Sequence, residues 1–296
     1  MDERAALSLL ADRLPRAGDD AAVVDGHVLT TDMLHETTDF PAGTTRYTAG
    51  WRAVGASLSD VAAMGAEATA AVAVYAAPEF EEADLAEFVA GASDVCEVVG
   101  AEYVGGDLDE SREFTTATTA LGATDDPVYR SGASPGEVVC VTGTLGRTAA
   151  ALELFEQNKT ERANDLFRFE PRIAAGRALA PHATAMMDSS DGLARSLHQL
   201  AEASDCGFSV SWDSVPVAEG VREVTEERGD GEEAVRERSL FFGEDFELVF
   251  TISEDRLSAI RPESPTPISM IGEVTDSGVE MDGAELPDRG YTHGGE

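Results

Sequence analysis

Positive charge is what this sequence has least of. Its 296 residues include 21 Lys plus Arg against 57 Asp plus Glu, for a formal net charge of −36 at pH 7, and Lys159 is the only lysine. Such a polyanion repels the phosphate backbone of nucleic acid, so we expect no nucleic-acid partner. At ordinary ionic strength the charge would also repel itself, whereas molar salt shortens the Debye length to about 3 Å. The composition therefore predicts a halophilic protein from a salt-rich cytoplasm.

Cysteine and long apolar runs are scarce as well. Cys96, Cys140 and Cys206 lie far apart without a C-x-x-C pair, which indicates neither a zinc ribbon nor a disulfide framework, and buried free thiols are expected. No apolar run approaches the ~20 residues that a membrane-spanning helix needs. Residues 1–4 open an acidic amphipathic helix instead of a signal peptide. We therefore expect a cytoplasmic protein with no membrane partner.

Motifs of nucleophilic catalysis and of P-loop nucleotide binding are also missing. No glycine-rich turn is followed by Lys-Ser or Lys-Thr, so the sequence has no Walker A loop. A nucleotide would therefore have to be held through metal ions, backbone amides and arginine. The histidines form no zinc-like pair and lie in no nucleophile elbow. They are His27, His35, His182, His198 and His293.

Regular apolar periodicity, by contrast, is present throughout. With 43% hydrophobic residues the chain can bury a substantial core, which argues against an acidic disordered protein. Helical and extended segments alternate and predict an α/β (α+β) fold. The turn-rich segment 125–136 marks a hinge. We expect an amino-terminal domain over residues 1–135 and a carboxy-terminal domain over residues 136–296.

The same periodicity predicts the individual elements. The strongly charged segment 222–238 is expected to be a solvated helix or loop. Helices are predicted over residues 3–14, 49–64, 79–99, 146–157, 171–180 and 193–203, and strands over residues 21–24, 28–32, 68–75, 102–107, 114–122, 137–143, 185–187, 207–212 and 247–251.

Aspartates recur beside small residues at the ends of predicted strands and turns. Carboxylate and hydroxyl oxygens are the hard ligands that Mg²⁺ prefers, and glycine and serine leave room for a ligand. Each cluster alone is more typical of a turn or a helix cap than of a metal site. Their combination in one chain favours magnesium ions held between carboxylates and phosphates. The clusters are Gly18-Asp19-Asp20, Thr30-Thr31-Asp32, Ser59-Asp60, Gly105-Gly106-Asp107 and Asp188-Ser189-Ser190-Asp191-Gly192.

In their order along nearly the whole chain, these segments resemble the thiamine-monophosphate kinase family, a branch of the aminoimidazole-ribonucleotide-synthetase-like ATP-binding superfamily. The resemblance implies an amino-terminal mixed-sheet domain that pairs with a second subunit, and a carboxy-terminal α/β domain that closes over the site. It also implies transfer of the γ-phosphate of ATP to thiamine monophosphate with Mg²⁺. Further matching segments are Leu58–Ala66, Arg130–Ala133, Gly243–Leu248 and Gly290-Tyr291.

By the same resemblance, individual residues acquire expected roles. The substrate contacts are Asp39, Glu244 and Tyr291, where Asp39 stands in a position that a histidine often occupies in the family. The ATP contacts are Gly106, Arg130 and Ser190. The metal ligands are Asp20, Thr30, Thr31, Asp32, Asp60, Asp107, Asp188 and Asp191.

The implied chemistry needs no catalytic base. The acceptor is a phosphate oxygen that is already ionised at neutral pH, so positioning and charge neutralisation carry the reaction. Arg130 would add a fixed positive charge, and Tyr291 would stack on the cationic thiamine rings.

Two alternatives remain at this point. A sister enzyme of the superfamily, such as aminoimidazole ribonucleotide synthetase, shares the scaffold, although the segments 188–191 and 243–245 disfavour it. The sisters that need a reactive cysteine are disfavoured because no cysteine precedes Cys96 and none lies at the carboxy terminus. A non-catalytic acidic protein that buffers divalent cations is the other alternative, and it would bind them without any dependence on ATP.

Overall fold

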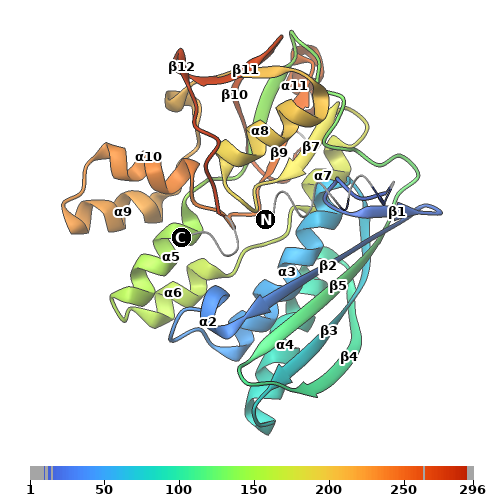
Figure 1. Ribbon diagram of the computed structural model, residues 1–296, viewed down its shortest axis with the longest axis vertical. Helices are drawn as coiled ribbons and strands as arrows, with labels where there is room; N and C mark the ends of the chain where they lie inside the picture. The colour runs from blue at the N-terminus through green and yellow to red at the C-terminus, as the bar shows by residue number, and fades with distance from the viewer. Residues whose placement is uncertain (1–9, 11–12, 15, 263, 292–296) are drawn as a thin grey trace.

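The computed structural model describes residues 10, 13–14, 16–262 and 264–291. It contains two β-sheets with helices packed on them (Figure 1), which confirms the expected α/β fold with mixed sheets. The strands of the first sheet end by Ala123 and those of the second begin at Val138. The domain boundary after residue 135 stays a prediction, and the helix expected over residues 3–14 lies almost wholly outside the described residues.

The first sheet is built from β1 (Ala22–Val24), β2 (His27–His35), β3 (Glu67–Ala77), β4 (Glu102–Glu110) and β5 (Thr115–Ala123). Its order is β1-β2-β5-β3-β4, and only the pair β3/β4 is parallel. The helices of this half are α2 (Glu36–Asp39), α3 (Arg46–Ala63) and α4 (Glu82–Val99). In Figure 1, α3 and α4 cover one face of the sheet, and no helix of the described residues covers the other.

Helix α3 is the central element of the molecule. It begins after Thr45, whose hydroxyl accepts a hydrogen bond from the Thr48 N–H at 3.1 Å and caps the helix. Glycines let α3 and α4 approach closely, because a Cβ at Gly50 would collide with the Phe88 carbonyl and one at Gly91 with the Tyr47 carbonyl. One buried cluster joins apolar residues of α3 to those of both sheets. The two halves therefore pack together around α3.

The second sheet has seven strands in the order β12-β11-β8-β10-β6-β9-β7, and only β8/β11 is parallel. Its strands are β6 (Val138–Thr142), β7 (Ala185–Asp188), β8 (Gly207–Val210), β9 (Leu248–Ile252), β10 (Ile268–Thr275), β11 (Gly278–Met281) and β12 (Ala284–Glu285). Its helices are α5 (Arg147–Glu156), α6 (Thr160–Phe167), α7 (Ile173–Leu179), α8 (Leu193–Ser204), η1 (Trp212–Ser214), α9 (Glu219–Arg228), α10 (Glu232–Leu240) and α11 (Glu254–Ile260).

Several local expectations were wrong. Gly105-Gly106-Asp107 lies inside β4 and forms no turn, because β4 continues to Glu110 beside β3. Thr30-Thr31-Asp32 lies in the middle of β2, and Asp60 lies in the last turn of α3. The segment 222–238 is neither one helix nor a loop, since α9 ends at Arg228, Gly229 follows with φ 75°, and α10 begins at Glu232. The elements α6, α11 and β10 to β12 were not expected.

The cysteines behave as the sequence suggested. Cys96, Cys140 and Cys206 are buried and unpaired with one another. Burial raises the pKa of Cys96 and of Cys140 to about 12, so both thiols stay protonated and unreactive at neutral pH. In the part of the chain that the structure describes, no helix is both long and apolar enough to cross a membrane.

Candidate metal and substrate site

Three aspartates from distant parts of the chain meet between the two sheets. Asp20 precedes β1, Asp60 lies in the last turn of α3, and Asp188 ends β7. Each offers one carboxylate oxygen, and these oxygens all lie within 4.8 Å of one another. Figure 1 shows β1, α3 and β7 converging there. The packing of both halves on α3 therefore concentrates negative charge at one point.

Hydroxyl groups orient these carboxylates. Thr30 Oγ1 donates to Asp60 Oδ2 at 2.5 Å, and Ser59 Oγ donates to Asp188 Oδ2 at 2.6 Å. The other oxygen of Asp188, Oδ1, is buried without a hydrogen-bond partner. A buried carboxylate oxygen without a partner carries a large desolvation cost. A bound cation would relieve that cost.

Asp32 extends the cluster along the inner face of the first sheet. It accepts a hydrogen bond from Ser57 of α3 at 2.8 Å, and its charge acts on Asp60. Loss of solvent, followed by repulsion from Asp32 and Asp188, raises the pKa of Asp60 well above its ordinary value. Burial and the charge of Asp20 raise the pKa of Asp188 to about 7. A divalent cation would reverse both effects, and an all-oxygen donor set suits Mg²⁺.

Arg130 supplies the positive charge nearest this cluster. Its Nε and Nη2 donate to Asp20 at 3.2 and 3.0 Å, so the pair is bidentate. Burial alone would lower the pKa of Arg130, but the charge and hydrogen bonds of Asp20 raise it above its ordinary value. Arg130 therefore stays charged while it compensates one member of the aspartate cluster.

Beside Asp188, three segments that are distant in sequence form a common lip. The Glu244 N–H donates to the Ser190 carbonyl at 2.6 Å, and the Tyr291 N–H donates to the Asp191 carbonyl at 3.1 Å. A Cβ at Gly243 would collide with the Ser190 carbonyl, so only glycine permits this approach. We call residues 188–192, 243–247 and 290–291 the substrate lip. It places polar side chains directly beside the aspartate cluster.

Comparison with known proteins identifies this arrangement. Residues 18–124 match the model of the AIR synthase related protein N-terminal domain, and residues 134–282 match that of the C-terminal domain. The chain is 61% identical over 295 residues to thiamine-monophosphate kinase of Halobacterium salinarum, covering 99% of this chain and 100% of that protein. The chain belongs to the thiamine-monophosphate kinase family. Another family member, from Methanospirillum hungatei, is 39% identical over 306 residues and 99% of each chain.

A solved structure of the same family has the same fold. That structure, AaThiL complexed with AMPPCP and TMP, superimposes with a TM-score of 0.91 and is 29% identical to this chain. The match covers 99% of this chain and 97% of that one. The family resemblance inferred from the sequence motifs is therefore confirmed.

Some of the family-implied residues lie apart from the aspartate cluster. Gly106 and Asp107 lie on β4, which the sheet order separates from β2 by β5 and β3. Thr31 points to the outer face of β2, where it donates to the Thr118 carbonyl at 2.8 Å. The ligand roles of these residues stay predictions.

Asp39 also lies outside the aspartate cluster, at the end of α2. Its Oδ2 accepts hydrogen bonds from the His35 N–H at 2.7 Å and from Thr38 Oγ1 at 2.8 Å. Its Oδ1 is buried and has no hydrogen-bond partner. A substrate contact by Asp39 stays a prediction, and these local bonds fix the position of its carboxylate.

Sequence reasoning missed the buried polar residues that support the lip. Asp245 accepts hydrogen bonds from the N–H groups of Gly146 and Thr148, at 2.5 and 2.9 Å. Glu247 is held by Arg172 through two hydrogen bonds of 2.8 and 2.6 Å. The signal was available, because three acidic residues in the run Gly243–Leu248 directly precede a strand of buried residues. Burial of such carboxylates requires partners, which only the fold supplies.

The buried Asp245 makes stability depend on pH. Burial raises its pKa to about 6 from an ordinary 3.8, so its protonated form is favoured by folding. The stability it contributes is complete below about pH 4 and is lost as pH rises through about 6. We expect Asp245→Asn to gain stability relative to the wild type over that interval, by on the order of 2 kcal/mol. Urea unfolding at pH 4, 5, 6 and 7 measures this difference, and a constant difference would contradict the shifted pKa.

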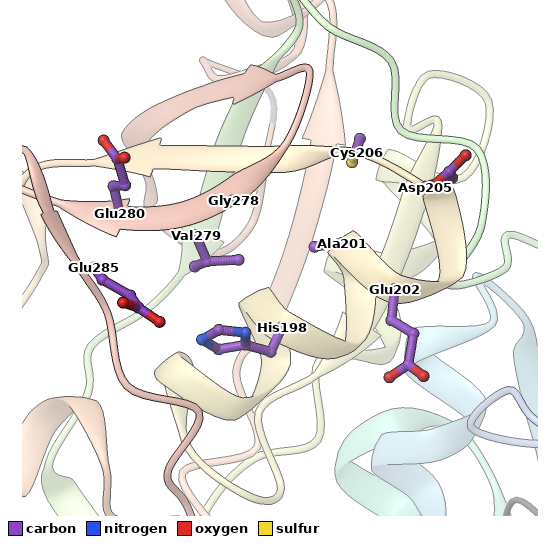
Figure 2. A pocket seen from close by; sticks show the side chains of 9 residues that line it. All are labelled: His198, Ala201, Glu202, Asp205, Cys206, Gly278, Val279, Glu280 and Glu285. Carbon is purple, nitrogen blue, oxygen red and sulfur yellow. The ribbon is translucent and has the colours of Figure 1, made fainter.

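A separate surface groove of about 650 Å³ lies between α8 and the strands β11 and β12 (Figure 2). Glu202, Asp205, Glu280 and Glu285 line it, and His198 there contacts the Leu286 carbonyl at 2.8 Å. None of the residues that line the groove belongs to the aspartate cluster or to the substrate lip. The groove therefore contains none of the residues expected to bind metal or substrate, and the aspartate cluster is the better candidate site.

Proposed function

We propose that this chain transfers the γ-phosphate of ATP to thiamine monophosphate and so forms thiamine diphosphate. The observation that carries the proposal is the convergence of Asp20, Asp60 and Asp188 within 4.8 Å, directly beside the substrate lip. Relatives that match the full chain bear the name of this activity, and the similar solved structure holds an ATP analogue and TMP.

Magnesium is the metal that the donor set fits best. Asp20, Asp60 and Asp188, with Asp32 and Thr30 beside them, would hold it through oxygen atoms only. When bound, Mg²⁺ offsets the repulsion between two anionic phosphates and stabilises the transferring group. The buried Oδ1 of Asp188 supports this assignment, because it has no hydrogen-bond partner in the protein and a metal ion would supply one interaction.

The protein's own residues position the reactants. Arg130 is bound to Asp20 in this structure, and its guanidinium would supply a fixed positive charge to a phosphate of ATP bound beside the aspartate cluster. Ser190 and Gly106 are the other proposed ATP contacts, and Asp191 is a further proposed metal ligand. Because the accepting phosphate is already ionised, none of these residues has to remove a proton.

A homodimer would complete the site. The uncovered face of the first sheet exposes Leu29, Met33, Val72 and Val74 at 46%, 56%, 37% and 37%. Contiguous exposed apolar surface of this kind marks an interface, and a two-fold dimer buries the same patch on both subunits. We propose that the two uncovered faces pair.

The position of Asp107 gives this dimer a chemical role. Asp107 pairs with Val74 on β4 and shares its outward direction, as Thr31 does on β2. Three strand spacings separate β2 from β4, which is about 14 Å. Within one chain Asp107 is therefore too far from Thr31, which lies on the same outer face of the sheet, to share a ligand with it, whereas a partner subunit packed on this face would bring its own Asp107 closer to Thr31. We propose that each site uses Asp107 and Gly106 of the partner.

The net charge of −36 supports a protein that works in a salt-rich cytoplasm, where ATP is also available. We expect the melting temperature to fall by roughly 10 °C or more when the KCl concentration is lowered from molar to ~0.1 M. At the lower concentration the repulsion between surface carboxylates is no longer screened. Differential scanning calorimetry across a KCl series measures this. An unchanged melting temperature would rule out the halophilic adaptation.

An assay in molar KCl with Mg²⁺ and ATP tests the proposed function. Thiamine monophosphate and thiamine are offered separately, and thiamine diphosphate is measured by chromatography. Product from the monophosphate alone supports the proposal. ATP binding without product from either would favour a sister activity, and Mg²⁺ binding without any effect of ATP would favour a cation buffer.

A further inference from the structure

Arg52 is a buried arginine of α3 that belongs to neither the aspartate cluster nor the substrate lip. Only 1% of it is exposed. Its Nη1 donates to the Phe167 carbonyl at 2.7 Å, and its Nη2 donates to Glu244 Oε2 at 2.7 Å. The guanidinium carbon lies 3.7 Å from the centroid of the Phe167 ring. Main-chain, carboxylate and aromatic contacts together leave this side chain one orientation.

Glu244, the partner of Arg52, is held from several directions at once. It has a positive φ of 67°, which is uncommon for a residue with a side chain. Its N–H donates to Ser190, and its carbonyl accepts from Thr148 Oγ1 at 2.7 Å. The main chain is therefore fixed within the substrate lip. The carboxylate, whose side chain is 22% exposed, takes its direction from Arg52.

Arg52 also connects the lip to the aspartate cluster. Arg52 and Asp60 lie on the same helix, eight residues apart, which corresponds to about 12 Å along the axis. Helix α3 therefore sets the separation between the proposed metal ligand Asp60 and Arg52, which anchors the carboxylate of Glu244. The phosphate of a substrate would lie at one end of this span and its rings at the other.

We propose that Arg52 is a positioning residue that orients Glu244 toward the thiamine end of the substrate. The inference rests on the proposed function, and it has Arg52 act through Glu244, its hydrogen-bond partner. Its loss should weaken binding of thiamine monophosphate without weakening binding of ATP, because the proposed ATP contacts are Arg130, Ser190 and metal.

Steady-state kinetics of Arg52→Met test the proposal in molar KCl. We expect the KM for thiamine monophosphate to rise roughly 10- to 100-fold, because the loss of one charge-assisted hydrogen bond has about this effect. The KM for ATP should change less than about twofold. Arg52→Lys keeps the charge but reaches only one acceptor, and we expect an intermediate KM. Equal KM values for thiamine monophosphate in the wild type and Arg52→Met would overturn the proposal.

A double mutant separates positioning from general damage. If Arg52 acts through Glu244, then Arg52→Met added to Glu244→Gln raises the KM no further than Glu244→Gln alone. Effects that multiply would overturn the proposal. Arg236→Met is the matched control, because Arg236 also faces a carboxylate, Asp282 at 3.3 Å, and a ring, Trp212 at 5.6 Å, away from the lip. We expect wild-type KM values from it.

Two outcomes keep the inference distinct from the proposed function. A wild type without turnover of thiamine monophosphate overturns both. An active wild type with an unaffected KM in the Arg52 variants overturns only the role of Arg52. The melting temperature and the binding of an ATP analogue show whether Arg52→Met folds. If it does not, Arg52→Lys decides the question, by its KM for thiamine monophosphate relative to that of the wild type.

Discussion

Asp188→Asn is expected to abolish turnover and at the same time to raise the melting temperature of the metal-free protein. Asparagine keeps the shape of Asp188 and still accepts from Ser59, but it removes a negative charge from the metal site. Loss of metal-borne charge stabilisation is worth several kcal/mol, so kcat should fall roughly 100- to 10,000-fold. Without metal, the same change relieves repulsion from Asp20 and Asp32, and we expect roughly 2–4 °C for each kcal/mol relieved.

The measurement pairs kcat in saturating Mg²⁺ with calorimetry in EDTA. Asp205→Asn is the matched control, since Asp205 is exposed beside the surface groove and its φ of 51° suits asparagine. That variant should leave both quantities unchanged. Wild-type turnover by Asp188→Asn would remove Asp188 from the metal site. A lowered melting temperature in EDTA would show that groups of the protein itself compensate the charge of the Asp188 carboxylate without metal.

Subunits carrying Asp107→Asn are expected to regain activity when paired with subunits carrying Asp188→Asn. Each variant alone should be inactive with its fold intact, because Asp107 is exposed on β4 and no described hydrogen bond to another strand depends on it. In a mixed dimer, one site receives an intact Asp188 from one subunit and an intact Asp107 from the other. The mixed dimer should therefore reach about half of the wild-type kcat per dimer.

Co-expression with two different affinity tags isolates the mixed dimer, and the coupled ATP assay then measures it. A mixed dimer no more active than its parents would place Asp107 in the site of its own chain. Full activity of the Asp107→Asn homodimer would remove Asp107 from the site. Size-exclusion chromatography in molar KCl checks the dimer itself, and a monomeric wild type would contradict the paired sheets.

Local periodicity was sufficient for most of the elements but not for their limits. The helix predicted over residues 49–64 is α3, Arg46–Ala63, because small and apolar residues recur on it at helical spacing. Gly105 and Gly106 misled the prediction of a turn. Gly106 instead permits a close approach, because a Cβ there would collide with the Ala73 carbonyl of β3, and Gly105 has a positive φ of 138° at the register shift between β3 and β4. Strand pairing of this kind involves residues far apart in the chain, which a local pattern does not contain.

The sequence by itself determined the family of this protein and the oxygen donors that its motifs offer. Runs such as Asp188–Gly192 and Gly243–Leu248 carry their oxygen donors and glycines in a recognisable order, and that order does not depend on coordinates. The tertiary structure alone decided which of these residues meet. Asp20, Asp60 and Asp188 come together because α3 packs against both sheets, while Asp107 is kept apart by two intervening strands. Distances between such segments follow from the packing of buried surfaces, and no spacing along the chain encodes them.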